Sequence, residues 1–157
     1  MTQPIPEGFH TVTPCLVFKD SRKAIEFYKK AFGAKMLSVL PGPDGQGTMH
    51  ASLKIGNSVV MMADEMPGQP CKSPETLGLS PVSFYVYTEK VDALFNRALQ
   101  AGATVVMPLQ EMFWGDRAGQ VQDPFGYRWM IASHTKDLTD PEIMKGAQGF
   151  CAGAGKK

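Results

Sequence analysis

The chain repeats one pattern of structural elements twice, and this internal repeat constrains its fold more than any other feature of the sequence. When the sequence is shifted by 69 positions, residues 17–35 align without a gap on residues 86–104. With one further residue of shift, residues 54–62 align on residues 124–132, so that a glycine meets a glycine between two apolar runs. Identical residues are few, but the types of element agree throughout. We therefore expect two modules of the same architecture.

Each repeat begins with a short run of β-branched and aromatic residues, which is typical of a strand. Apolar residues then recur every three or four positions up to a glycine, which predicts a helix and its end. Three further strand-like runs follow, so the sequence predicts an α+β fold of two tandem βαβββ modules. We expect an N-terminal extension over 1–10, a first module over 11–64, a linker over 65–80, a second module over 81–134, and a partly disordered C-terminal tail over 135–157 with a short helix over 138–144.

The composition excludes several classes of function. Sixteen basic and fifteen acidic side chains give no field that would attract nucleic acid or an anionic membrane. The first ten residues lack the features of a signal peptide and no apolar run is long enough to cross a bilayer, so we expect a cytoplasmic protein. Three cysteines without CxxC spacing indicate neither a disulfide framework nor a cysteine-rich zinc site.

Two segments carry a resemblance to a known family. The duplicated module, with AIEFYKKAFGA at 24–34 and DPFGYRWMIA at 123–132, resembles the vicinal oxygen chelate superfamily of glyoxalase I, extradiol dioxygenases, and bleomycin and fosfomycin resistance proteins. The segments at 49–64 and 113–129 are most similar to its PhnB-like branch. The resemblance implies that the strands of each module curl into half of a cup, with helices outside and the ligand or metal inside. It also implies a homodimer in which two chains complete the cups.

Strand alternation sorts the side chains between the helices and the cup, because successive residues of a strand point to opposite faces. Taking the apolar positions of each strand as helix-facing leaves two predicted sets on the cup face. The first module contributes Thr13, Cys15, His50, Ser52, Val59 and Met61, and the second contributes Val82, Phe84, Gln120, Gln122, Arg128 and Met130.

The resemblance also locates the metal ligands of the superfamily. It places the four ligand positions at Thr13, Met61, Val82 and Met130. None of these is His, Gln, Glu or Asp, and a thioether is a poor ligand for the hard and borderline divalent ions. We therefore predict no metal and no other cofactor at the usual place. A metal site rebuilt elsewhere, with His50 as a ligand, stays open as an alternative.

Several polar and aromatic residues are candidates to contact a ligand. His50 suits an acid, a base or a hydrogen-bonding group, or is a histidine satisfied by a neighbouring strand. Trp114 suits stacking on a ligand, or a core or dimer contact. Arg117 suits an anionic group, or a structural bond to Asp123 in the turn over 123–126. The predicted ligand contacts are Cys15, Ser52, Trp114, Arg117, Gln120, Gln122 and Arg128, with His50 as the candidate catalytic residue.

Three functional hypotheses follow. The first is a small-molecule-binding protein that takes an aromatic or polar metabolite or drug in the cup without a metal at the usual site. The second is an enzyme, a lyase or isomerase of the superfamily with a site rebuilt around His50. The third is an interaction role, in which Met61, Phe84 and Met130 fill the cup. The expected partners are a small-molecule ligand and a second copy of the chain.

Overall fold

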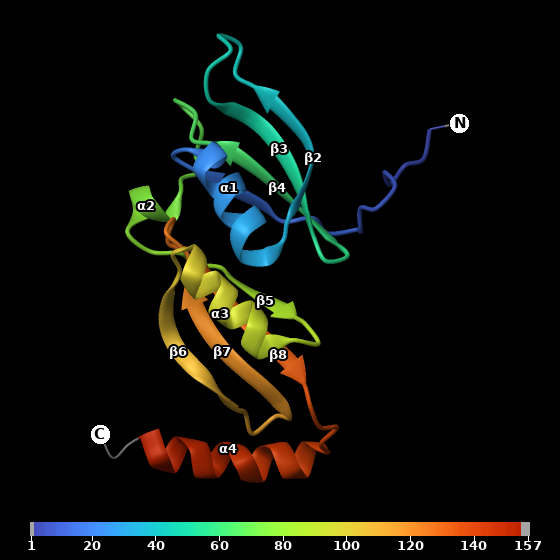
Figure 1. Cartoon of the computed structure of the whole chain (residues 1–157), viewed down its shortest axis with the longest axis vertical. Coiled ribbons are helices and arrows are strands. Elements are labelled where there is room, and N and C mark those ends of the chain that lie inside the picture. Colours follow the sequence, from blue (N-terminus) through green and yellow to red (C-terminus); the bar gives the residue numbers. More distant parts are fainter. Residues whose placement is uncertain (1, 155–157) are drawn as a thin grey trace.

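The computed structural model describes residues 2–154 and shows two βαβββ modules arranged end to end (Figure 1). The predicted α+β fold is confirmed. The first module consists of β1 (Cys15–Phe18), α1 (Ser21–Phe32), β2 (Lys35–Pro41), β3 (Thr48–Ile55) and β4 (Ser58–Asp64). The second consists of β5 (Ser83–Tyr87), α3 (Val91–Ala101), β6 (Thr104–Glu111), β7 (Asp116–Gln122) and β8 (Arg128–His134). Helix α2 (Pro74–Leu77) lies between the modules and α4 (Asp140–Ala154) follows them.

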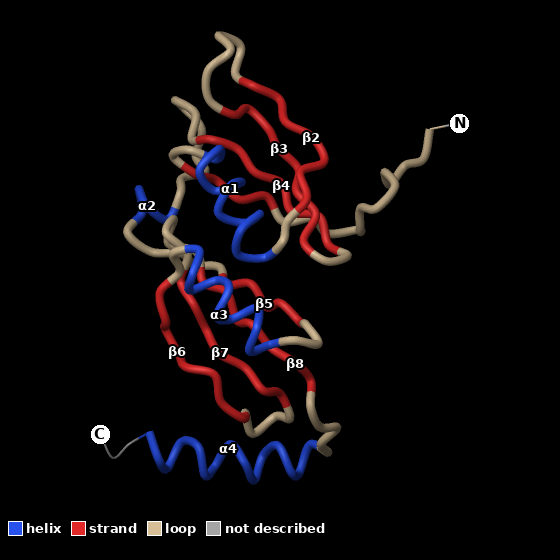
Figure 2. Tube along the Cα trace, in the orientation of Figure 1, coloured by secondary structure: helices blue, strands red, loops and turns tan. Residues whose placement is uncertain are grey.

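Each module forms one four-stranded mixed sheet (Figure 2). The strand orders are β1-β4-β3-β2 and β5-β8-β7-β6, and in each sheet the first and last strands of the module run parallel. One helix packs on one face of each sheet, and the other face is the predicted cup face. Because the two sheets have the same order, equivalent positions of the two modules can be compared strand by strand.

The modules meet through their helices, α1 and α3 (Figure 1). Arg97 of α3 donates hydrogen bonds to the carbonyl oxygens of Lys30, at 2.5 Å, and Lys29, at 3.2 Å. These carbonyls belong to the last turn of α1, where no helical N–H is available to bond them. A cation there also complements the negative end of the helix dipole. The end of α1 is thus bonded by the neighbouring module.

Asp123 forms the turn that the sequence predicted and also joins the two modules. Its Oδ1 accepts the backbone N–H groups of Phe125 and Tyr127, both at 2.9 Å. Its Oδ2 accepts the hydroxyl of Tyr28 in α1, at 2.5 Å, and the indole N–H of Trp129, at 3.0 Å. Burial raises the pKa of this carboxyl above its usual value, although the four donors oppose that shift. Trp129 itself lies in the core.

Strand β5 corrects one prediction from alternation. Phe84 does not face the cup, because its ring packs in the core with its centroid 4.6 Å from that of Trp129. In the first sheet Cys15 of β1 pairs with Met61 of β4, and in the second sheet Tyr85 of β5 pairs with Met130 of β8. Cys15 and Tyr85 are therefore equivalent positions at a shift of 70, whereas the sequence alignment used a shift of 69. One residue of error reverses every side chain of a strand. The cup-facing residues of this strand are therefore Ser83, Tyr85 and Tyr87; Val82 precedes the strand.

The C-terminal helix is longer than the short helix that the sequence predicted. Helix α4 passes beside the turn between β6 and β7 (Figure 1). A Cβ at Gly146 would lie 2.8 Å from the Cβ of Phe113, so the glycine permits this close approach. The ring of Phe113 also contacts Phe150, with centroids 5.6 Å apart. Of the tail predicted to be disordered, residues 155–157 lie outside the described part of the chain. No helix within residues 2–154 is long and apolar enough to cross a membrane.

Candidate functional site

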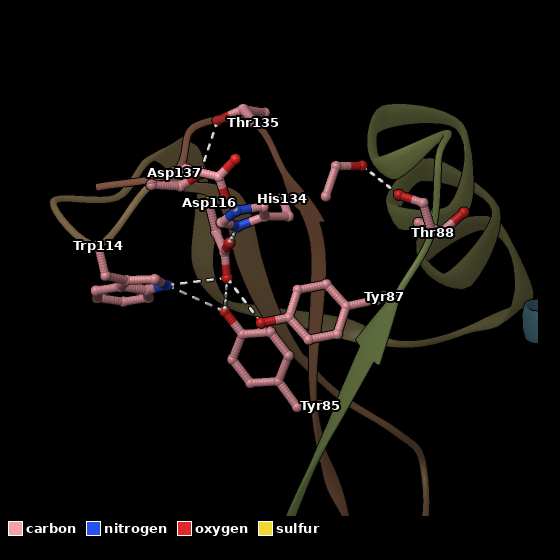
Figure 3. Close-up of polar contacts among 10 residues, drawn as sticks. Tyr85, Tyr87, Thr88, Trp114, Asp116, His134, Thr135 and Asp137 are labelled. Carbon is pink, nitrogen blue, oxygen red and sulfur yellow. Dashed lines mark hydrogen bonds and ion pairs between the residues drawn. The ribbon is translucent and has the colours of Figure 1, made fainter. Parts of the chain in front are cut away.

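The cup face of the second sheet carries a buried carboxylate bonded by four side chains (Figure 3). Asp116, at the start of β7, is only 2% exposed. It accepts hydrogen bonds from Tyr85 Oη at 2.8 Å, Tyr87 Oη at 3.1 Å, Trp114 Nε1 at 3.0 Å and His134 Nδ1 at 2.8 Å. Tyr85, Tyr87 and Trp114 are called the aromatic wall below. Asp116 therefore orients three aromatic rings from two separate segments of the chain.

Local sequence explains why these rings converge. Tyr85 and Tyr87 are two residues apart on one strand, so they share a face. Trp114 lies in the turn between β6 and β7, where Gly115 has φ of 97° and a Cβ would lie 2.1 Å from the carbonyl oxygen of Lys136. Only glycine adopts that conformation at such a close approach. The indole of Trp114 packs against Met112, Ala118 and Ala132, two of which are small enough to leave it room.

The electrostatics of the cluster fix its protonation state. Burial raises the pKa of Asp116, but the hydrogen bonds from His134, Tyr85, Trp114 and Tyr87 outweigh burial and leave the pKa below its usual value. Burial, followed by the hydrogen bond to Asp116, raises the pKa of Tyr85 well above the usual range for a phenol. The carboxylate is therefore ionised and the phenol protonated at neutral pH.

His134 links the cluster to the surface. Its Nε2 lies 3.0 Å from Asp137 Oδ1 and its Nδ1 bonds Asp116, so the imidazole lies between two carboxylates. The hydrogen bond to Asp137, followed by that to Asp116, raises the pKa of this imidazole above its usual value. The fully protonated ring donates to both carboxylates at once.

The cup face of the first sheet is chemically different. His50, Ser52 and Cys15 lie on it, as the sequence predicted, and His50 Nε2 is 3.2 Å from Ser52 Oγ. Met61 lies between Cys15 and Ser52 in the strand register. Burial is the main cause that raises the pKa of the Cys15 thiol, which favours its protonated form. Aromatic side chains are absent from β3 and β4.

The other predicted contacts are distributed over the second sheet. Gln120 lies in the same row of the cup face as Tyr85 and Met130. Gln122 and Arg128 pair at the far end of that face from Asp116 and His134, beside a groove of about 550 Å³ next to α2. The sheet thus places the Gln122 amide and the Arg128 guanidinium at one end, and Gln120 beside Tyr85 of the aromatic wall.

Arg117 does not join these residues. It follows Asp116 on β7 and so points to the helix side, where it bonds Asp92 of α3 at 2.6 Å and 3.1 Å and lies 3.6 Å from Glu111. The structural role that the sequence allowed for Arg117 is therefore present, but its partner is Asp92 rather than Asp123. Its position makes a contact with a ligand in the cup unfavourable.

Sequence reasoning missed Tyr85, Tyr87, Asp116 and His134. The alternation in SFYVY gave the signal for the two tyrosines, but the alignment error in β5 assigned Phe84 to the cup instead. Asp116 lies next to Arg117 at the start of β7. No sequence pattern connects it with His134, because the pairing of β7 and β8 brings these two residues together.

The donor set of the cup does not fit the metal site of the superfamily. Met61 and Met130 lie on the cup face at two of the predicted ligand positions, Thr13 precedes β1, and Ser83 faces the cup in place of Val82. Two thioethers and two hydroxyls are an unfavourable set for a divalent ion. Within residues 2–154, no three His, Cys, Asp or Glu residues are grouped so that they could hold a metal ion.

Comparison with known proteins agrees with this architecture. The sequence profile of the Glyoxalase/Bleomycin resistance protein/Dioxygenase superfamily matches residues 8–131. The uncharacterized protein Rv0887c of Mycobacterium tuberculosis is 44% identical over 135 residues, which are 84% of this chain and 79% of the relative.

Two solved structures are similar in fold. Protein PA1353 from Pseudomonas aeruginosa aligns with a TM-score of 0.66 and 27% identity over 81% of this chain and 99% of its own. A PhnB protein from Bacillus cereus, described as a putative 3-demethylubiquinone-9 3-methyltransferase, aligns with a TM-score of 0.62 and 21% identity, over 79% of this chain and 99% of its own. Given the duplicated module, the two matching sheets and the profile match across both, the chain belongs to the glyoxalase/bleomycin resistance/dioxygenase superfamily.

Proposed function

We propose that the protein binds a small molecule in its cup, without a metal at the position used by metal-dependent members of the superfamily. The observation that carries the proposal is the aromatic wall, in which two exposed tyrosine rings and the partly buried Trp114 are fixed by one buried carboxylate. Rigid aromatic surfaces bury much ligand area at little cost in side-chain entropy. A wall held in place before the ligand arrives favours binding for the same reason.

The state of Asp116 supports binding rather than proton transfer at this cluster. Four donors occupy the carboxylate, so it has little remaining capacity to accept a proton from a substrate. The raised pKa of Tyr85 makes this phenol a poor base. Both groups therefore support a role in positioning the rings.

A second copy of the chain is part of this proposal. In a single chain the modules lie end to end (Figure 1), and a cavity of about 500 Å³ is lined by Val59 of the first module and by Tyr85 and Tyr87 of the second. Leu40 and Tyr87, on the cup faces of the first and second sheets, are 54% and 62% exposed. Large exposed apolar surfaces favour association. We propose a homodimer that brings two cup faces together. Analytical ultracentrifugation over a range of protein concentrations tests this proposal, and a monomer at every concentration contradicts it.

Ligand binding is tested by a thermal-shift screen of aromatic and polar metabolites and drugs on the purified protein. A ligand at 100 times its Kd should stabilise the fold by about 2.7 kcal/mol. Trp114→Ala should abolish the shift, whereas Arg117→Gln, on the opposite face of the sheet, should keep it. No stabilising compound in a broad library, or an unchanged shift in Trp114→Ala, contradicts the proposal.

An enzyme of the superfamily is the second candidate, and the contact between His50 and Ser52 favours it. A histidine beside a buried hydroxyl on the cup face is placed to move a proton. Turnover of a glutathione hemithioacetal that is lost in His50→Gln would support a lyase or isomerase.

We also propose that the chain belongs to the PhnB-like branch, because the segments at 49–64 and 113–129 resemble that branch.

A further inference from the structure

We infer that the aromatic wall selects a large organic cation, such as a quaternary ammonium or an N-alkylated heteroaromatic ring. This inference rests on the proposed function, because it names the chemical class of the ligand at the same site. Three features carry it: exposed ring faces, an ionised carboxylate behind the rings, and the saturation of that carboxylate by hydrogen bonds.

The ring faces are available on the cup side. Tyr85 and Tyr87 are 43% and 62% exposed, and their ring centroids are 5.0 Å apart with the planes tilted by 37°. Trp114 joins them, since its indole N–H lies 3.3 Å from Tyr85 Oη as well as bonding Asp116. The faces of aromatic rings carry negative electrostatic potential, which attracts ammonium and other organic cations. Three adjacent rings offer more of this surface than a single one.

The carboxylate strengthens the preference for positive charge. Both phenols and the indole donate their polar hydrogens to Asp116, so their positive edges point towards the carboxylate and leave the ring faces free of these hydrogens (Figure 3). Donation to an ionised acceptor also shifts electron density towards the rings. Asp137 adds a second negative charge at this end of the sheet, and protonated His134 offsets only one of the two. These three groups together therefore carry a net negative charge beside the rings.

Saturation of the carboxylate determines the type of cation. Oδ2 of Asp116 accepts three donors, Oδ1 accepts His134, and the residue is only 2% exposed, so the surrounding side chains obstruct direct approach of a cation to this carboxylate. A small ion such as Na⁺ or Mg²⁺ requires direct oxygen ligands in exchange for its water. A large, weakly hydrated organic cation instead meets the ring faces, where π surface replaces its hydration. The geometry therefore favours organic cations over metal ions.

The test compares two probes that differ in charge and have the same number of heavy atoms. N-methylquinolinium is permanently cationic, and 4-methylquinoline is neutral at pH 8. We expect the wild-type chain to bind the cation at least tenfold more tightly by calorimetry. In Asp116→Asn the preference should fall below threefold. Asp92→Asn removes the same charge on the opposite face of the sheet, and this control should keep the preference.

A second variant guards against misfolding of Asp116→Asn. Tyr87→Leu removes one ring and leaves Asp116 with its bonds to Tyr85, Trp114 and His134, so it should lower affinity for the cation at least fivefold while circular dichroism stays unchanged. Equal or tighter binding of 4-methylquinoline overturns the inference and leaves the proposed function standing. If neither probe binds while other compounds stabilise the protein through Trp114, the inference again fails alone. If no compound binds, both the inference and the proposed function are overturned.

Discussion

The two modules share one scaffold but use their carboxylates differently. Asp64, at the end of β4, accepts the backbone N–H groups of Ser21 at 2.6 Å and Thr48 at 2.7 Å, and so holds the starts of a helix and a strand. Asp116, in the second module, accepts only side-chain donors, most of them aromatic. A carboxylate that bonds backbone stabilises the fold, whereas one that orients exposed rings shapes a surface. Duplication has thus preserved the architecture while one cup face acquired its own chemistry.

The turns show a similar difference. The hairpin between β3 and β4 contains Asn57, which is exposed and accepts only the hydroxyl of Ser58 at 3.3 Å. The equivalent hairpin of the second module contains Asp123, which is buried and bonds four donors, one of them the hydroxyl of Tyr28 in the first module. We infer that the second hairpin has become part of the core that joins the modules. Four predictions test how far this asymmetry extends.

The largest effect should follow loss of the Asp123 carboxylate. Asp123→Ala leaves buried hydroxyl, indole and backbone donors without an acceptor, and should lower the free energy of unfolding by about 3–5 kcal/mol. Asn57→Ala, at the exposed hairpin of the first module, should change it by less than about 0.5 kcal/mol. Urea denaturation measures both. Equal losses at the two sites would show that the hairpins contribute alike.

The next effect compares two turn glycines. Gly115→Ala in the second module combines positive φ with a contact to the carbonyl oxygen of Lys136, and should lower the free energy of unfolding by about 2–4 kcal/mol. Gly45→Ala in the first module has positive φ but open space around the new Cβ, and should cost about 1 kcal/mol. Thermal denaturation with both variants checks the difference. A tolerated Gly115→Ala would show that the turn carrying Trp114 is not held rigidly.

A third prediction sets the two cup faces against each other. Trp114→Ala should weaken binding of an aromatic ligand at least tenfold, because it removes the largest ring of the wall; tenfold corresponds to about 1.4 kcal/mol. His50→Ala, on the first cup face and outside the aromatic wall, should change Kd by less than twofold. Fluorescence titration measures both variants. A larger effect of His50→Ala would place the first module in the same binding site.

The smallest effect concerns pH. Because the folded-state pKa of His134 is raised, its stabilising contribution is fully present below the ordinary histidine pKa of about 6.5 and is lost as pH rises through the raised value. The difference in Tm between wild type and His134→Asn should therefore be larger at pH 5.5 than at pH 8.5. Asp137→Asn should remove most of this dependence, since the bond to Asp137 is its main cause. A constant difference would mean that the imidazole keeps one protonation state throughout.

Much of the fold followed from the sequence alone, but the candidate site followed only in part. Helix stripes, their terminal glycines and the turn at Asp123 are local signals, and each of them predicted its element correctly. The positions of His50, Ser52 and Gln120 on the cup faces also followed from alternation. The faces of Arg117 and Phe84 did not follow from alternation, because they depend on the exact start and register of β7 and β5.

The sequence by itself determined the duplicated βαβββ architecture, because periodicity, capping and turn chemistry act between residues that are close along the chain. Only the tertiary structure decided the cluster around Asp116. Its members span residues 85–134 and meet through the parallel pairing of β5 with β8 and the antiparallel pairing of β7 with β8. Side-chain direction in a strand reverses with each residue, so a single step of register decides whether tyrosines or a phenylalanine face the ligand.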